Sequence, residues 1–307
     1  MLSSSERRGN DSTGEGPRRG VCAMFVSPHF DDVAMSCGGI ISRYVARSDR
    51  VLVVTVFTRG PRAKTDITPF AAGYTAACGL DRTATTKLWR LRRSEDAAAM
   101  TELGSIGRSL GYRDAIYRGP YNDVNTLFGH VRREDAPLIE KVHHDIVTLW
   151  RRTCPHAVVF LPLAIGRHVD HQICYQAGNA LRGARARVWY YEDCPYAINV
   201  QAIEWRLREI GTPLSSMTID ISSHIERRIS ATRHYVTQLP LLFHGRMEVA
   251  MRSFAARYAF GSGLFGERIW TPSPNFPRPA SRQSDDHLPE PPRQRLRVRQ
   301  RATPRVS

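Results

Sequence analysis

The sequence predicts an α/β fold, namely a Rossmann-like, doubly wound and mostly parallel sheet with flanking helices. Short apolar runs alternate with amphipathic segments along most of the chain, which is the order expected of βαβ units. Polar clusters directly follow two of those apolar runs, where open parallel sheets bind their ligands. With 307 residues, the chain is long enough to bury one large core.

The N-terminal part reads as a first βαβ unit. Residues 21–28 (VCAMFVSP) form a short apolar run flanked by turn-forming residues, which indicates a buried strand. Residues 33–48 have helical apolar spacing, and residues 50–58 (RVLVVTVFT) are rich in valine, as strands are. This compact strand–helix–strand order implies parallel pairing. Residues 59–86 are irregular, and we expect a long loop or lid with a short helix.

The alternation continues to about residue 193, and two further helices are expected beyond it. The expected elements are a helix at 92–112 ending near Gly111, a short strand at 114–119, a helix at 136–153, a strand at 156–163, a helix at 169–181, a strand at 186–193, and helical segments at 222–239 and 246–260. We therefore predict a disordered leader at 1–20, a single domain at 21–271 and a disordered basic tail rich in Pro and Arg at 272–307.

The formal net charge is +15, and the last 30 residues carry eight arginines against three acidic residues. Such a balance suits either a solvated basic surface or a protein that binds nucleic acid or an anionic membrane. We favour the solvated surface and expect no specific nucleic-acid partner. Deleting residues 278–307 separates the two, because affinity for nucleic acid would fall with the tail while an activity of the domain at 21–271 would survive.

Several classes of protein are disfavoured by what the sequence lacks. It has no apolar run near the roughly 20 residues of a transmembrane helix and no signal-type block, so a cytoplasmic protein is expected. The six cysteines are scattered without a CxxC pair, which argues against a disulfide framework or a zinc ribbon. Neither a G-x-S-x-G elbow nor a P-loop is present. GSGLFG, residues 261–266, follows a helical segment and is interpreted as a flexible loop, so dinucleotide use is not expected.

The first polar cluster, SPHFDD, places His29, Asp31 and Asp32 where a strand passes into a helix. A single aspartate there is usually a helix N-cap. Capping accounts for one carboxylate but leaves the second carboxylate and the histidine unexplained. Two adjacent carboxylates become tolerable when a cation lies beside them. His29 and Asp32, three positions apart across the turn, could both reach one metal ion.

The second cluster, GRHVDH, follows the run at 156–163 and places His168 and His171 near each other at a helix start. His29, Asp32 and one of these histidines would make a three-ligand site with an open position for water, as in catalytic zinc sites. Asp31 would then be free to act as the general base. Two histidines and a carboxylate also suit Fe²⁺.

SPHFDD…SCGG together with GRHVDH resembles the PIG-L/LmbE-like family of zinc-dependent N-acetylglucosaminyl deacetylases. The resemblance covers roughly residues 21–197 and includes the stretches RRSEDAAAMTELG and YYEDCPYA. It implies an LmbE-like fold and a metal-dependent N-deacetylase, an amide hydrolase that releases acetate from an N-acetylated amino sugar. The expected partner is a small-molecule or glycoconjugate substrate carrying that sugar, and the expected cofactor is Zn²⁺, with Fe²⁺ as the alternative.

The resemblance also implies roles for individual residues. It makes His29, Asp32 and His171 the zinc ligands and Asp31 the general base. The catalytic group would be completed by His168, which stabilises the oxyanion and protonates the amine, and by Asp170, which orients or tunes a neighbouring histidine. Substrate binding falls to Arg92, three residues before Glu95.

This sequence departs from the commonest family pattern at three positions that supply no ligand. Pro28 stands where alanine is usual, and Phe30 and Val169 stand where proline is usual. These changes alter the stiffness of the two turns. They indicate a divergent branch of the family, in which the loops at 59–86 and 119–134 would select the substrate. The alternative is a basic nucleic-acid- or membrane-binding protein on a catalytically altered LmbE-like scaffold.

Overall fold

The computed structural model describes residues 23–184 and 186–272. Their centre is a seven-stranded sheet in the spatial order β3-β2-β1-β4-β5-β7-β6. The strands are β1 (Ala23–Ser27), β2 (Val51–Arg59), β3 (Ile106–Arg113), β4 (Val158–Pro162), β5 (Arg187–Tyr191), β6 (Leu214–Asp220) and β7 (Gly266–Pro272). Strands β1 to β5 pair in parallel, whereas β7 runs antiparallel to both β5 and β6.

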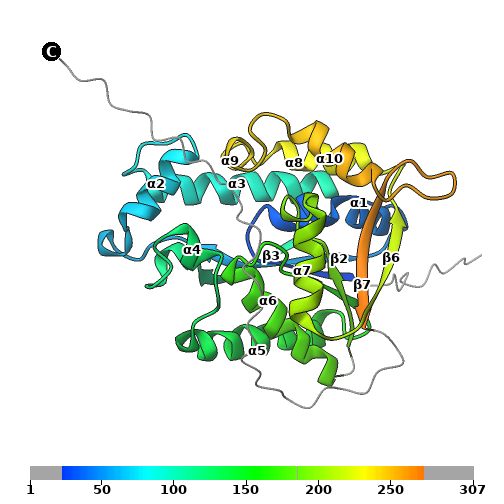
Figure 1. The fold of residues 1–307 in the computed structure, drawn as a ribbon, viewed down its shortest axis with the longest axis horizontal. Helices are drawn as coiled ribbons and strands as arrows, with labels where there is room; N and C mark the ends of the chain where they lie inside the picture. Colours follow the sequence, from blue (N-terminus) through cyan, green and yellow to red (C-terminus); the bar gives the residue numbers. More distant parts are fainter. Residues whose placement is uncertain (1–22, 185, 273–307) are drawn as a thin grey trace, which may run out of the picture.

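Helices cover the sheet on both sides, which confirms the predicted α/β fold. Figure 1 shows α1, α3, α8 and α10 on one side and α5 and α6 on the other. The helices are α1 (Asp32–Ala46), α2 (Pro69–Ala77), α3 (Thr85–Leu103), α4 (Val124–Leu127), α5 (Ala136–Thr153), α6 (Val169–Asn179), α7 (Val200–Ile210), α8 (Ile225–Arg233), α9 (Leu239–Phe243) and α10 (Met247–Ala256). The predicted leader at 1–20 and all but Pro272 of the predicted tail lie outside the described residues.

The strand order creates a topological switch point between β1 and β4. From β1 the chain winds outward through α1 to β2 and β3, and β4 then returns to the other side of β1. A crevice opens between neighbouring strands that lead in opposite directions, and ligands bind there at the carboxyl ends. The two polar clusters of the sequence follow these two strands.

Two predictions between residues 85 and 119 are wrong. The helix expected at 92–112 starts earlier, as α3 at Thr85, and ends at Leu103, where Gly104 takes a left-handed φ of +70° that terminates it. The segment that follows is β3, which pairs with β2 at the sheet edge. Its first residues are exposed, so it lacks the apolar run that marks a buried strand. The short strand expected at 114–119 is a 3₁₀ turn, Ala115–Tyr117.

The C-terminal strands close the sheet and hold α1 in place. Glu267 on β7 accepts backbone N–H bonds from Gly39 and Ile40 of α1 at 2.9 and 2.8 Å. The fully buried Arg228 of α8 lies 3.3 Å from the Glu267 carboxylate and donates to the Met35 carbonyl. Because α1 begins at the first polar cluster, these contacts fix the helix whose N-terminus carries the candidate site.

Candidate active site

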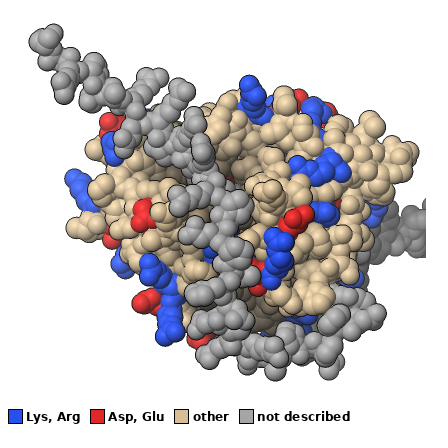
Figure 2. Space-filling view, in the orientation of Figure 1, with Lys and Arg blue, Asp and Glu red and all other residues tan. Residues whose placement is uncertain are grey.

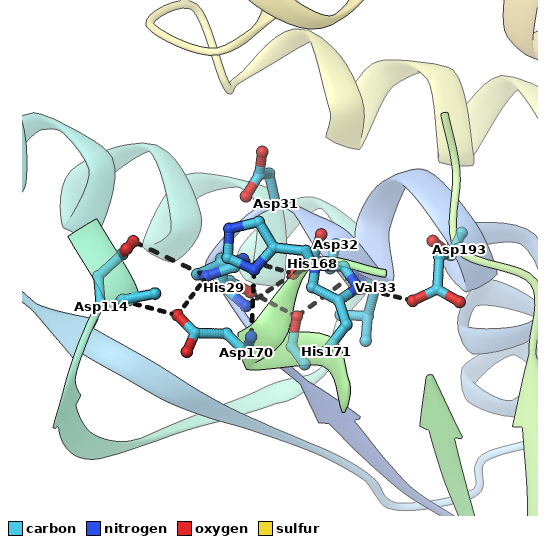
Figure 3. A network of polar contacts seen from close by, with 12 residues as sticks. His29, Asp31, Asp32, Val33, Asp114, His168, Asp170, His171 and Asp193 are labelled. Carbon is cyan, nitrogen blue, oxygen red and sulfur yellow. Dashed lines mark hydrogen bonds and ion pairs between the residues drawn. The ribbon is translucent and has the colours of Figure 1, made fainter. Parts of the chain in front are cut away.

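The structure brings both polar clusters together at the carboxyl ends of β1 and β4. His29, Asp31 and Asp32 lie in the turn from β1 into α1, and three more candidate side chains lie at the start of α6 (Figure 3). His168 is the N-cap of α6, with Asp170 and His171 in its first turn. All six side chains are buried. The centroids of the three imidazole rings lie 4.8–5.4 Å apart.

The loop that delivers the second cluster has an unusual backbone. Ala164 and Arg167 both have φ near +62°, and Gly166 between them has φ of +87°. A Cβ on Gly166 would lie 2.5 Å from the Tyr196 ring, so glycine is required there for both conformation and space. Backbone held in this rarely populated region is a common feature of sites where a side chain must be aimed. In this loop, the residues with positive φ directly precede His168 and set the direction of its side chain.

Asp32 lies between two histidines. Its Oδ2 atom is 3.2 Å from His29 Nδ1 and 3.3 Å from His171 Nε2. The same oxygen accepts a 2.7 Å hydrogen bond from the His29 backbone N–H. Burial by itself would raise the pKa of Asp32. The charge and hydrogen bond of His171, together with those of His29, outweigh burial and hold the pKa of Asp32 well below its usual value. Asp32 is therefore a carboxylate with two histidine nitrogens converging on one oxygen.

His171 leaves one ring nitrogen free for a ligand bond. Its Nδ1 is 2.6 Å from Asp193 Oδ1, so the carboxylate accepts a hydrogen bond from Nδ1–H. Its Nε2 is buried and makes no hydrogen bond, although the Asp32 carboxylate lies 3.3 Å away. Burial lowers the pKa of His171, but Asp32 and Asp193 outweigh it and raise the pKa to about 9. Without a bound metal the ring is therefore protonated at neutral pH, and Nε2 must lose its proton before it can act as a ligand. An imidazole bonded to a carboxylate at one nitrogen and open at the other is the usual arrangement of a metal-binding histidine.

The described residues contain two groups that could hold a metal ion. One is made of the three histidines His29, His168 and His171, and the other of His29, Asp114 and Asp170; within each, the ligand atoms lie within 4.8 Å of one another. Asp32 adjoins the first group through its contacts with two of those histidines. The donor set of imidazole and carboxylate, together with the unpartnered Nε2 of His171, fits a divalent transition metal.

Asp31 occupies the N-cap position of α1 without capping the helix. Its carboxylate makes no hydrogen bond to the helix N-terminus, and Figure 3 draws no contact between it and the other site residues. Its neighbour is Arg92 on α3, whose Nη2 lies 3.3 Å from Asp31 Oδ1. Burial raises the pKa of Asp31 against the lowering effect of Arg92. Capping thus fails to explain Asp31, whereas a raised pKa suits a proton acceptor.

Asp170 is a buried carboxylate that holds His29. Its Oδ2 lies 3.1 Å from His29 Nε2 and accepts a 3.0 Å hydrogen bond from the Ala115 N–H. Arg118 donates to Asp170 Oδ1 at 2.6 Å. Burial opposes ionisation, but Arg118 and His29 hold the pKa of Asp170 below its usual value. The contact with His29 is the one through which Asp170 would orient that histidine.

The tautomer of His168 follows from one contact. Its Nδ1 accepts a 3.2 Å hydrogen bond from the Asp170 backbone N–H, which can only donate. Burial and the charge of His29 hold the pKa of His168 well below its usual value. The ring is therefore neutral, and its proton lies on Nε2. That N–H is available to a developing negative charge.

Three site residues were missed by the sequence analysis: Asp114, Asp193 and Arg118. Asp114 lies 3.7 Å from His29 Nε2 and 3.8 Å from Arg92 Nη1. It directly follows β3, but the sequence predicted a helix over most of that strand and placed Asp114 at the start of a strand, so Asp114 was not recognised as a residue at a strand end. Asp193 stands within the stretch predicted as a strand at 186–193, and the rule that sites form at strand ends could have identified it.

Comparison with known proteins places the chain in a family. A family model described as PIG-L: GlcNAc-PI de-N-acetylase matches residues 24–181, which contain both clusters. The 2'-N-acetylparomamine deacetylase of Streptomyces fradiae is 30% identical over 281 residues, covering 84% of this chain and 91% of that protein. The chain belongs to the PIG-L family. This confirms the resemblance predicted from the two motifs. A 2'-N-acetylparomamine deacetylase of Niallia circulans is 29% identical over 187 residues, 56% of this chain and 66% of that protein.

Solved structures agree with the family assignment. The A40926 pseudoaglycone deacetylase has a TM-score of 0.66 and 25% identity, covering 82% of this chain and 97% of its own. Two teicoplanin deacetylase structures, one bound to bog and one in a zinc-inhibited form, have TM-scores of 0.71 and 0.69 at 24% identity, each covering 83% of this chain and 100% of its own. These last two relatives show that the fold is shared.

Proposed function

We propose that this PIG-L family chain is a metal-dependent N-deacetylase that removes the N-acetyl group from an N-acetylglucosamine-type moiety, releasing acetate. The observation that carries the proposal is Asp32 between His29 and the unpartnered His171 Nε2, with Asp31 beside it and uncommitted to helix capping. The relatives named above support it, because they are deacetylases. We take the substrate to be a glycoconjugate or natural-product precursor, as are the aminoglycoside and glycopeptide compounds in those relatives' names.

In this proposal His29, Asp32 and His171 hold the metal, Zn²⁺ or Fe²⁺. Bound there, such an ion supplies a Lewis acid and lowers the pKa of a water molecule. Asp193 accepts a hydrogen bond from His171 Nδ1–H, which leaves Nε2, once deprotonated, as the nitrogen that offers its lone pair. Asp170 accepts from His29 Nε2 and thereby directs His29 Nδ1 toward Asp32. The two carboxylates thus orient the two histidines.

The proton steps fall to Asp31 and His168. Asp31 takes the proton of the attacking water, for which its raised pKa suits it. His168 donates its Nε2–H to the oxyanion that develops on the acetamide oxygen. The departing amine needs one proton, and the proton that Asp31 has taken from the water supplies it, because a neutral His168 that gave up its single N–H proton would become an imidazolate. The products are a free amino sugar and acetate.

Arg92 is proposed to bind substrate. Its side chain is 3% exposed, and its guanidinium lies 5.0 Å from the centroid of the Trp89 ring. Nε and Nη1 of Arg92 are buried without hydrogen-bond partners, while Nη2 reaches Asp31. Nη1 lies 3.8 Å from Asp114 without a hydrogen bond to it, and these two unbonded nitrogens support a ligand role, since buried donors are otherwise paired.

The basic-binding alternative has less support. On the face shown in Figure 2, Lys and Arg are interspersed with Asp and Glu and form no continuous basic surface. No helix among the described residues is long and apolar enough to span a membrane. A binding role would also fail to explain why histidines and carboxylates are clustered and buried at the candidate site.

Acetate release from a panel of N-acetylglucosamine conjugates tests the proposal. We expect turnover by the metal-loaded protein and a loss of about 10²–10⁴-fold in kcat for Asp31→Asn, because the general base is removed. Glu204→Gln, an exposed residue on α7, makes the same change of charge as a control and should leave kcat unaltered. An Asp31→Asn protein that binds the metal and keeps full activity would sink the assigned base.

A further inference from the structure

A basic pocket of about 760 Å³ lies at the carboxyl ends of β2 and β3, beside the candidate active site. Its floor and walls come from the turn after β2, the first turns of α3 and α5, and the end of β3. Arg118 belongs to both places, because it lines the pocket and donates to Asp170. Trp89, whose ring faces Arg92, is a second shared residue. A molecule bound at Asp31 could therefore extend into this pocket.

The pocket concentrates positive charge. Seven basic side chains line it against two acidic ones, Glu134 and Asp135, whereas the whole chain has 44 basic and 29 acidic residues. The basic residues are Arg59, Arg62, Arg90, Arg93, Arg113, Arg118 and Lys141. Asp135 is already engaged, since it accepts a 2.6 Å hydrogen bond from Tyr121 and lies 3.6 Å from Arg118.

Several of these cations have no acidic partner. Within the described part of the chain, Arg59, Arg90 and Lys141 form no ion pair, and Arg93 bonds only the Thr58 carbonyl. Arg62 and Arg113 share Asp66, at 3.9 and 3.8 Å. Like charges gathered in a cleft repel one another and create a positive potential. An anion bound there would relieve that repulsion.

Guanidinium groups recognise phosphate and carboxylate in particular. Each presents paired N–H donors that match two oxygens of such a group. A substrate rich in ammonium groups, by contrast, would meet repulsion in this pocket. The charge pattern thus points away from a polycationic substrate, even though two relatives are named for an aminoglycoside.

We infer that the substrate of this enzyme carries an anionic group, a phosphate or a carboxylate, and that the basic pocket binds it while the acetamide lies at Asp31 and His168. This inference rests on the proposed N-deacetylase function. It makes Arg59 and Arg90, which contact none of the proposed metal ligands, determinants of substrate choice.

The test compares four N-acetylated sugars with the metal-loaded, full-length protein. They are the methyl glycoside of N-acetylglucosamine, N-acetylglucosamine 1-phosphate, N-acetylmuramic acid and 2'-N-acetylparomamine, which are respectively neutral, phosphorylated, carboxylated and cationic. We expect kcat/KM to be about tenfold or more higher for at least one anionic sugar than for the neutral one, and lowest for the cationic one. The advantage should shrink between 50 and 500 mM NaCl, since salt screens exposed charges.

Substitutions of pocket arginines test whether the preference for an anionic sugar depends on this pocket. Arg59→Gln and Arg90→Gln should each raise KM for the preferred anionic sugar about five- to tenfold, with little change in kcat, because each removes a charge-assisted contact remote from the reacting bond. Arg208→Gln removes an exposed arginine of α7 that does not line the pocket, and it should leave KM unchanged. Comparing the phosphate and carboxylate sugars identifies which anion is bound.

Failure of this inference and failure of the proposed N-deacetylase function give different results. Equal kcat/KM for neutral and anionic sugars, unchanged in Arg59→Gln and Arg90→Gln, would overturn the inference and leave the deacetylase function standing. If no sugar is turned over, the deacetylase proposal fails, and calorimetric titration of N-acetylglucosamine 1-phosphate then tests the pocket by itself. Binding that weakens in Arg90→Gln but not in Arg208→Gln would support an anion site, and an absence of binding would exclude it.

Discussion

At the scale of single residues, Asp193 decides which nitrogen of His171 is free. Asp193 Oδ1 accepts a hydrogen bond from His171 Nδ1–H and Oδ2 accepts one from the Ile165 N–H at 3.0 Å, so both oxygens are committed. Asp193→Asn keeps the size of the side chain but puts an NH₂ group where an acceptor is needed. If that NH₂ faces His171, the ring must accept at Nδ1 and carry its proton on Nε2, which blocks the ligand position.

Asp193→Asn is therefore expected to weaken zinc binding about 10–100-fold, as loss of a carboxylate behind a ligating histidine usually does. Competition with a chromophoric chelator measures the affinity. Glu204→Gln is the matched control on α7. An unchanged dissociation constant in a folded Asp193→Asn protein would show that Asp193 plays no part in holding the metal.

The sequence identified some of these residues and missed others for a physical reason. His29, Asp31 and Asp32 are adjacent, as are His168, Asp170 and His171, so each group stands out as a cluster after an apolar run. Asp114 and Asp193 follow two other strands, β3 and β5, and only the parallel pairing of the strands brings them to the same edge. A residue that joins a site through sheet packing alone leaves little local pattern to recognise.

At the scale of elements, a buried aspartate on α3 connects the helix that carries Arg92 to the segment that follows α8. Asp96, one turn after Arg92, is 8% exposed and accepts a 3.1 Å hydrogen bond from Tyr235, just beyond α8. Burial raises the pKa of Asp96 to about 7, although the Tyr235 bond opposes the shift. Between pH 4 and pH 7 the folded protein thus holds a proton that the unfolded chain releases. Its free energy of unfolding falls as pH rises through that window.

Asp96→Asn removes this titration while its amide oxygen still accepts from Tyr235. We expect the variant to match the wild type near pH 4 and to exceed it by about 2–4 kcal/mol in unfolding free energy at pH 8. Urea denaturation at a series of pH values measures the difference. Glu204→Gln should stay within about 0.5 kcal/mol of the wild type throughout. A difference for Asp96→Asn that does not grow with pH would refute the raised pKa.

Helices and strands could be predicted from the sequence where their residues are strongly buried on one face or on both faces. The strands β1, β2 and β4 are buried throughout or nearly so, and their apolar runs revealed them. The edge strands β3 and β6 have exposed or half-buried residues and no clear alternation, so the helix pattern preceding β3 was extended through it. Pairing with a neighbouring strand, rather than local composition, makes these segments strands.

At the scale of the whole molecule, the proposed ligands join two parts of the chain far apart in sequence. His29 and Asp32 follow β1, and His171 follows β4, with more than 130 residues between them. A metal ion that binds all three binds the folded state alone, so it must stabilise folding by mass action. The apolar core extends across the sheet independently of these residues, so the metal-free protein should stay folded.

We therefore expect a chelator to abolish acetate release without unfolding the protein at 25 °C. Zinc at about 100 times its dissociation constant should add about 2.7 kcal/mol, or roughly 4–5 °C in Tm for a chain of this size. Thermal denaturation followed by circular dichroism measures the shift, with zinc added from one equivalent upward because one relative has a zinc-inhibited form. His171→Asn should lose the shift, whereas His144→Asn, an exposed histidine of α5, should keep it. Equal stabilisation of both variants would mean that zinc binds elsewhere and that the three predicted ligands do not form its site.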